Sequence, residues 1–293
     1  MQLLLYIIIY PILWIISILP FPIFYLLSDF VCFLTYRVIG YRKKVVRDNI
    51  KLALPHLSEK ERLEIERKFY SHMCDMFLEM IKTITISQKE IEKRFTFSNM
   101  DVYYELEKKN KSIALMCAHY ASYEWVVSMN YYVNYKGFGI YKKLANPYFD
   151  KLVKRIRSKF KAHLITTKET IPTIAENHHN KILSLYGFAS DQSPKVNAAY
   201  HWAPFMGHIV PVHTGAEMLA KRFDMNVIFL KTKKLKRGYY QASFEVLSED
   251  AKSVPNYEIT DQFLKLVEQQ IYEAPEFYLW THKRWKHIKE KAQ

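Results

Sequence analysis

A histidine and a glutamate five positions apart, His119 and Glu124, are the side chains of this sequence best suited to acid–base chemistry. A carboxylate within hydrogen-bond reach of one imidazole nitrogen fixes the tautomer of the ring. It also stabilises the imidazolium that forms when the other nitrogen accepts a proton. Such a pair can remove a proton directly from a substrate hydroxyl, without a serine or cysteine nucleophile. A histidine packed near a strand end is the competing interpretation.

The residues around this pair predict a strand that ends near His119 and a helix that begins near Glu124. Residues 113–117 are a short apolar run without helical periodicity, which is typical of a buried strand. Ser122 is suited to cap a helix that continues through Trp125. A corner between a strand and a helix can bring residues five apart together, whereas a continuous helix cannot. We therefore expect Glu124 to orient His119.

The three cysteines, Cys32, Cys74 and Cys117, lie far apart in apolar surroundings. Their spacing fits neither a metal site nor a disulfide framework, so a reducing compartment is expected. Cys117 lies two residues before His119, and a thiol nucleophile there is an alternative. Strand cysteines are far more often simply buried.

The composition indicates a chain that works at an apolar interface and meets an anionic partner. Its 293 residues are enough for one large domain, or for one domain with an appendage. Aromatic residues make up 15% of the chain, which suits a lipid interface. The formal net charge of +14 favours nucleic acid, anionic lipid headgroups or an acidic carrier protein as the partner.

The N-terminal residues predict a membrane anchor. No charged residue occurs over residues 3–27, and two prolines divide this run into a helix to about residue 19 and a second apolar element over residues 23–36. Five basic residues between positions 37 and 47 follow, and by the positive-inside rule they keep the rest of the chain on the cytoplasmic side. We expect a membrane anchor over residues 1–36 and a catalytic domain over residues 37–293.

Strands alternate with helices after residue 110, which predicts an α/β core. A capping box at residues 58–61 predicts the start of a core-facing helix, and an amphipathic helix is expected over residues 260–273. Further strands are expected over residues 137–141, 182–188, 226–230 and 239–247. The basic residues between the last two strands predict a basic hairpin tip.

Residues 119–124, HYASYE, resemble the His-x-x-x-x-Asp/Glu motif of the lysophospholipid acyltransferase superfamily, in the Glu form of the bacterial lipid A late acyltransferases. Residues 275–286, PEFYLWTHKRWK, closely match the C-terminal signature of that family, and this is the most specific match. The tryptophans of this tail also suit an interfacial position. The resemblance covers about residues 23–285. It implies a central mixed sheet flanked by helices, as in the glycerolipid acyltransferases, with an N-terminal membrane-embedded helical segment.

The resemblance also implies binding residues around the His119–Glu124 pair. Lys142 stands where the family usually has Arg; a lysine keeps the positive charge for a phosphate or oxyanion but lacks the bidentate fork. Asp191 matches an acidic residue in a loop near the active site, although the residues alone equally support a turn. The implied substrate-binding residues are Lys142, Asn146, Arg155, Arg157, Asp191, Gln192 and Arg284.

The function implied by the resemblance is O-acyl transfer in lipid A biosynthesis, on the cytoplasmic face of a bacterial inner membrane. His119 would deprotonate a hydroxyl of a lipid A precursor as it attacks the thioester carbonyl of an acyl donor. The donor of the family is acyl-acyl carrier protein, whose acidity fits the charge of +14; acyl-CoA is the alternative donor. No metal or organic cofactor is needed, and the spacing of the histidines at positions 201, 208 and 213 fits no metal site.

Three alternatives stay open at this point. The acceptor can be another membrane lipid, such as a lysophospholipid or an aminolipid hydroxyl. Water can replace the acceptor, which would make the chain a membrane-bound esterase or thioesterase. A basic membrane or nucleic-acid-binding protein explains the charge but not the His119–Glu124 pair, and nucleic acid is not an expected partner.

Overall fold

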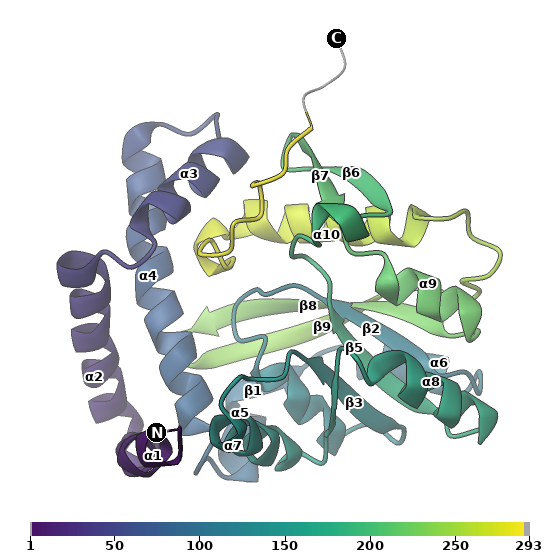
Figure 1. The fold of residues 1–293 in the computed structure, drawn as a ribbon, viewed down its shortest axis with the longest axis horizontal. Helices are drawn as coiled ribbons and strands as arrows, with labels where there is room; N and C mark the ends of the chain where they lie inside the picture. Colours follow the sequence, from purple (N-terminus) through teal and green to yellow (C-terminus); the bar gives the residue numbers. More distant parts are fainter. Residues whose placement is uncertain (1, 290–293) are drawn as a thin grey trace.

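Residues 2–289 are described by a computed structural model, in which a seven-stranded mixed sheet is flanked by helices (Figure 1). The strand order is β1-β9-β8-β2-β5-β3-β4, and only β8 and β9 pair antiparallel. The strands are β1 Phe95–Phe97, β2 Ile113–Cys117, β3 Lys136–Tyr141, β4 His163–Thr166, β5 Ser184–Ala189, β8 Asn226–Lys236 and β9 Tyr239–Ser248. A separate antiparallel pair is formed by β6 His201–Phe205 and β7 His208–Val212. The expected α/β class with a mixed central sheet is confirmed.

Helices precede the sheet and alternate with its strands. The α-helices are α1 Gln2–Ile18, α2 Phe21–Phe33, α3 Lys43–Ala53, α4 Glu59–Lys82, α5 Gln88–Arg94, α6 Met100–Glu107, α7 Pro147–Ser158, α8 Thr170–His179, α9 Gly215–Arg222 and α10 Glu258–Glu273. Shorter helical segments are the π-helix η1 Leu34–Ile39 and the 3₁₀ helices η2 Trp125–Tyr131, η3 Val196–Ala198 and η4 Pro275–Phe277.

Most of the predicted elements are confirmed, but the helix after His119 is not of the expected kind. Ser58 and Glu61 form the capping box of α4, and α10 covers the predicted amphipathic stretch. Ser122 caps no helix, because the chain stays in turns until Glu124 and then forms the 3₁₀ helix η2. Strand β4 and the β6–β7 hairpin are further elements that the sequence patterns did not predict.

The central strand β2 explains the apolar run before His119. It pairs in parallel with β5 on one side and with β8 on the other, so Ile113 lies opposite both Leu185 and Asn226. A strand in this position is covered on both faces, and its first four residues are buried. On the neighbouring strand, Phe229 packs against Phe263 of α10, with 5.8 Å between the ring centroids.

The two N-terminal helices pack against α4 (Figure 1). Their outer surface is apolar. Ile8 and Ile12 of α1 and Leu26 and Phe30 of α2 are more than half exposed. By length and composition, the helical stretch Phe21–Ile39 could cross a membrane, while α1 is shorter. The predicted division of the apolar run into a helix and a second apolar element is confirmed, since α1 ends at Ile18 and α2 begins at Phe21.

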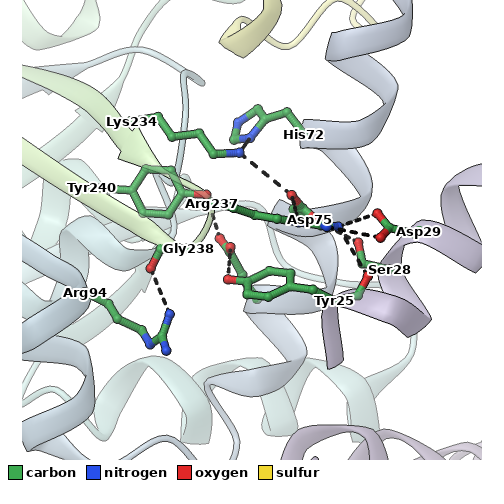
Figure 2. A network of polar contacts seen from close by, with 11 residues as sticks. Tyr25, Ser28, Asp29, His72, Asp75, Arg94, Lys234, Arg237, Gly238 and Tyr240 are labelled. Carbon is green, nitrogen blue, oxygen red and sulfur yellow. Dashed lines mark hydrogen bonds and ion pairs between the residues drawn. The ribbon is translucent and has the colours of Figure 1, made fainter. Parts of the chain in front are cut away.

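The tip of the β8–β9 hairpin carries an arginine that is paired with two aspartates of other elements (Figure 2). Arg237 Nη2 lies 2.5 Å from Asp29 Oδ1 of α2 and 2.7 Å from Asp75 Oδ1 of α4. Gly238 follows with a φ of +72°, and a Cβ there would lie 1.9 Å from the Tyr25 hydroxyl oxygen, so this position needs glycine. The tip is basic, as predicted, and it is docked against α2 and α4.

Glu79, a buried carboxylate of α4, belongs to the same network. Tyr25 of α2 and Tyr240 of β9 each donate a hydrogen bond to Glu79 at 2.9 Å. Burial raises the pKa of Glu79 to about 7, against the lowering effect of the Lys234 charge. Helix α2 is thereby joined to α4 and to the sheet by polar contacts as well as apolar ones.

Candidate active site

His119 and Asp191 lie side by side at the carboxyl ends of two parallel strands. The register pairs Cys117 of β2 with Ala189 of β5, so the residues two positions further along each chain are neighbours. His119 Nδ1 donates to Asp191 Oδ1 at 2.7 Å, and the backbone N–H of His119 donates to the same oxygen at 3.1 Å. The side chain of Asp191 is 1% exposed and that of His119 is 19% exposed. The pair leaves Nε2 as the imidazole nitrogen available to a substrate.

Asp191 controls the proton affinity of His119. Burial lowers the pKa of His119, but the charge of Asp191 and its hydrogen bond outweigh burial and raise the pKa above its usual value. The charge of Glu124 adds a smaller effect in the same direction. Burial raises the pKa of Asp191, yet the charge and hydrogen bonds of His119 bring it below its usual range. The arrangement is that of a general base with its orienting carboxylate.

The prediction that Glu124 orients His119 is therefore wrong, and Asp191 takes that place. Glu124 instead forms a forked ion pair with Arg157 of α7. Arg157 Nη2 lies 2.7 Å from both carboxylate oxygens, and Nε donates to Oε2 at 3.0 Å. The reason has two parts. The chain enters η2 directly after Glu124, and from there the carboxylate of Glu124 reaches α7. Strand β5 pairs with β2 and brings Asp191 to the imidazole of His119.

A cavity of about 720 Å³ lies beside His119. Charged and polar side chains from several elements line one part of it: Glu124, Lys142, Arg157, Gln192 and His213. Another part is apolar and is lined by Leu115, Gly139 and Gly187, which lie in one row across β2, β3 and β5. Two glycines in this row leave space that side chains would otherwise fill. The cavity can hold an extended apolar chain whose polar end lies at His119.

Four of the predicted binding residues lie at this site. Lys142, Arg157 and Gln192 line the cavity, and Lys142 is exposed at the end of β3. Asp191 lies at the imidazole of His119 rather than at the polar end of a substrate site. It is placed to orient the base, a role that the sequence analysis did not assign to it.

The other three predicted binding residues do not line the cavity beside His119. The side chain of Asn146 caps α7, where its Oδ1 accepts hydrogen bonds from the backbone N–H groups of Tyr148 and Phe149 at 3.0 and 3.4 Å. Arg155 is exposed on α7. Arg284 is fully buried, and its Nη1 donates to Ser193 Oγ and to a backbone carbonyl at 3.0 Å each. These contacts place Arg284 behind the loop of Ser193, and its assignment to substrate binding stays a prediction.

The alternative of a thiol nucleophile is disfavoured by the surroundings of Cys117. Burial raises the pKa of Cys117 to about 12, and the charges of Asp191 and Glu124 act in the same direction. A thiol nucleophile reacts as the thiolate, so Cys117 stays in its unreactive form at neutral pH.

The C-terminal segment fixes the loop that carries His119. The backbone N–H of Leu279 donates to the carbonyl of His119 at 3.2 Å, and the N–H of Ala121 donates to the carbonyl of Phe277 at 2.9 Å. Ala121 has a φ of +49°, which is uncommon for a residue with a Cβ. Contacts on both sides of His119 therefore hold a tight backbone turn.

The same segment fixes the loop that carries Asp191. Ser193 Oγ donates to the carbonyl of Arg284 at 2.7 Å, and the N–H of Ser193 donates to His282 Nε2 at 3.2 Å. Burial lowers the pKa of His282 to about 4, so its ring stays neutral and keeps an accepting nitrogen. The signature segment thus holds both halves of the His119–Asp191 pair.

The expected interfacial position of the C-terminal tryptophans is wrong. Trp280 is fully buried and Trp285 is 5% exposed. Their rings stack with 5.8 Å between centroids, and Trp285 also stacks on Phe205 of β6. These rings form the core behind the signature segment and do not face a membrane.

Two further residues of the site were not predicted from the sequence. The ring of Tyr123 meets His119 edge to face, with 4.9 Å between centroids. His213, in the loop after β7, lines the cavity, and burial lowers its pKa, so it is neutral. No local motif marks His213, because only the fold brings that loop to β2. Within residues 2–289, no group of three or more His, Cys, Asp or Glu is placed to hold a metal ion.

Comparison with known proteins agrees with this geometry. The model of the protein family described as bacterial lipid A biosynthesis acyltransferase matches residues 2–287 of the chain. A curated protein of Escherichia coli (strain K12), described as lipid A biosynthesis lauroyltransferase, is 22% identical over 276 residues. That alignment covers 94% of this chain and 89% of the relative.

Proposed function

The chain belongs to the bacterial lipid A biosynthesis acyltransferase family, and on that premise we propose that it moves a fatty acyl chain from acyl-acyl carrier protein to a hydroxyl of a lipid A precursor. Family membership makes the chain an acyltransferase. The observation that carries the proposal is the buried His119–Asp191 pair beside a cavity with a polar and an apolar part. The name of the Escherichia coli relative, a lauroyltransferase, supports a fatty acyl donor.

The proposed reaction transfers the acyl group directly from the sulfur of the thioester to the oxygen of the acceptor hydroxyl. Nε2 of His119 accepts the proton of the acceptor hydroxyl as its oxygen attacks the thioester carbonyl, and Asp191 stabilises the imidazolium. The tetrahedral intermediate then collapses, the C–S bond breaks, and the leaving thiolate takes the proton from His119. Lys142, which lines the cavity, supplies positive charge for the oxyanion. An ester and a free thiol are the products.

The basic surface around α7 supports an acidic acyl carrier as the donor. Lys142 and Lys143 are exposed before α7, and Lys151 and Arg155 are exposed on it. These charges lie next to the cavity beside His119, so a carrier bound to them could deliver its thioester to the site. Acyl-CoA is also anionic and is the alternative donor.

The outer surfaces of the N-terminal helices support a membrane location. We assign residues 1–36 to a membrane anchor and residues 37–293 to the catalytic domain. The apolar faces of α1 and α2 are exposed in the protein and would be covered by lipid. The five basic residues that follow favour a catalytic domain on the cytoplasmic side of a bacterial inner membrane.

Lipid analysis tests the reaction and the acceptor together. Total membrane lipids are compared by mass spectrometry in cells with the wild-type gene, with His119→Ala, and with the control His179→Ala, at equal protein levels. His179 is an exposed residue at the end of α8, so the control should match the wild type. We expect a lipid A species that lacks one acyl chain to accumulate only with His119→Ala.

Other outcomes would redirect the proposal. Loss of a chain from a different membrane lipid would keep the chemistry and replace the acceptor by a lysophospholipid or an aminolipid. Release of free fatty acid without an acylated lipid would indicate an esterase or thioesterase. No lipid difference between the three strains would contradict acyl transfer in the cell.

A further inference from the structure

A second cavity lies between three helices, next to the cavity beside His119. It has a volume of about 370 Å³, within the range of ~300–1,000 Å³ that is usual for small-molecule sites. We call it the α1–α4–α7 cavity. Its lining includes Leu13 of α1, Phe77 and Ile81 of α4, and Leu152 and Ile156 of α7.

The lining offers a ligand little except hydrocarbon contact. The two charged side chains at this cavity, Glu124 and Arg157, are bound to each other through three contacts of 2.7 to 3.0 Å. Because each charge already has its partner, neither calls for a charged ligand. The remaining lining is aliphatic and aromatic apart from Thr83. A flexible apolar chain is the ligand that such walls select.

The α1–α4–α7 cavity adjoins the cavity beside His119. Six residues line both of them: Met80, Glu124, Val127, Leu144, Val153 and Arg157. The two cavities are thus close enough for one molecule to place a hydroxyl at His119 and an attached chain in the second cavity, if that chain passes the Glu124–Arg157 pair.

Helix α1 contributes to one wall of this cavity and is apolar on both sides. Leu13 faces the cavity, while Leu4, Ile8 and Ile12 are more than half exposed. The helix lies at the foot of α4 beside α7 (Figure 1). Its contact with α7 is aromatic, since Tyr6 packs on the neighbouring rings of that helix at centroid distances of 5.5 and 5.8 Å. One wall of the cavity is thus a helix whose outer surface suits contact with a lipid bilayer.

We propose that the α1–α4–α7 cavity binds a hydrocarbon chain of the acceptor lipid while the acceptor hydroxyl lies at His119. This inference rests on the proposed function. Donor and acceptor must meet at one imidazole, so their two chains need separate sites. The donor carrier is hydrophilic and approaches from the exposed basic surface, and the glycine-lined part of the cavity beside His119 suits its acyl chain. The acceptor comes from the bilayer, on the side of α1.

Filling the α1–α4–α7 cavity with a larger side chain tests the proposal, because the KM for the lipid and the KM for the donor should respond differently. Ile156 lines the α1–α4–α7 cavity but not the cavity beside His119, so Ile156→Trp reduces the space for one chain only. Leu13→Trp fills it from the opposite wall and serves if the first variant folds poorly. Ile171→Trp, at an exposed position of α8, is the matched control.

The full-length variants are assayed in detergent micelles with lauroyl-acyl carrier protein and a purified lipid A precursor that lacks one secondary acyl chain. We expect the KM for the lipid to rise about tenfold or more in both cavity variants, because buried hydrocarbon contact is lost. The KM for the donor should stay within about twofold of the wild-type value. The control should show neither change.

Two results would overturn the inference. A rise in the donor KM, or a shift of donor preference to shorter chains, would place the donor chain in this cavity. Unchanged constants for both substrates in both variants would show that the cavity is not used. Absence of transfer by the wild-type protein would instead contradict the proposed function, so the two failures are distinguishable.

Discussion

Replacing Asp191 by asparagine removes a charge from the site but can keep its hydrogen bonds. The Nδ1–H and the backbone N–H of His119 both donate to the same carboxylate oxygen, at 2.7 and 3.1 Å. The amide oxygen of the introduced asparagine can occupy that position and accept both. Asp191→Asn therefore measures what the charge contributes, and Asp191→Ala, which also loses the bonds, should be more damaging.

The charge of Asp191 stabilises the imidazolium of the transition state. Two unit charges about 4 Å apart interact by about 4 kcal/mol at an effective dielectric constant of about 20. His119 keeps 19% of its side-chain surface exposed, and solvent there weakens the interaction, so a loss of about 2–4 kcal/mol is reasonable. At about 1.4 kcal/mol for each factor of ten, kcat should fall roughly 30- to 1,000-fold.

The pH profile identifies the origin of that loss. The free imidazole is the base, so the wild-type rate falls as the pH drops through the raised pKa of His119. In Asp191→Asn the charge of Asp191 no longer opposes the effect of burial, so the pKa of His119 should fall. The acidic limb of kcat/KM should therefore move to lower pH while the plateau drops. Rates measured from about pH 5 to about pH 9 cover this range.

The control for this experiment is Asp101→Asn, an exposed aspartate in the first turn of α6, which should leave the profile unchanged. An acidic limb that stays in place or moves to higher pH in Asp191→Asn would refute the assignment of Asp191 as the partner of the base.

Three further changes have distinct expected results. Glu124→Gln weakens the forked pair with Arg157 and should lower kcat about tenfold, which is less than the effect of Asp191→Asn. The acidic limb of the pH profile should stay almost unchanged, and a larger shift of this limb would return Glu124 to the role of orienter. Arg157→Ala leaves the largely buried carboxylate of Glu124 unpaired and should lower the free energy of unfolding, measured in urea, by about 2–4 kcal/mol. Arg157→Lys should restore only part of the lost stability. If Arg157→Ala is as stable as the wild type, the pair is dispensable for stability. Gly187→Val should shift donor preference to shorter acyl chains, because the added side chain would occupy part of the cavity. It fits without a clash, since a Cβ at this position meets only one atom within 4 Å, at 3.7 Å. An unchanged preference in a series of donors would place the acyl chain elsewhere.

Local patterns were sufficient for most of the fold. The apolar run over residues 113–117 had to be a central strand, because no face of it is polar, and the capping box at residues 58–61 marked the start of α4. The helix expected from Ser122 failed because turn and 3₁₀ geometry depend on how the loop packs, here against the C-terminal segment. The tryptophans of that segment have an amphipathic pattern, yet tertiary packing buries them.

The sequence by itself determined that His119 is the candidate base, that the chain is an α/β acyltransferase of a recognisable family, and that its N-terminal helices are apolar. The partner of the base was decided only by the tertiary structure. Asp191 is 72 residues from His119, and the two meet because β2 and β5 pair in parallel with Cys117 opposite Ala189. Strand register depends on packing across the sheet, and it cannot be derived from the spacing of residues along the chain. Proximity in sequence therefore favoured Glu124, and the fold placed that residue on Arg157 instead.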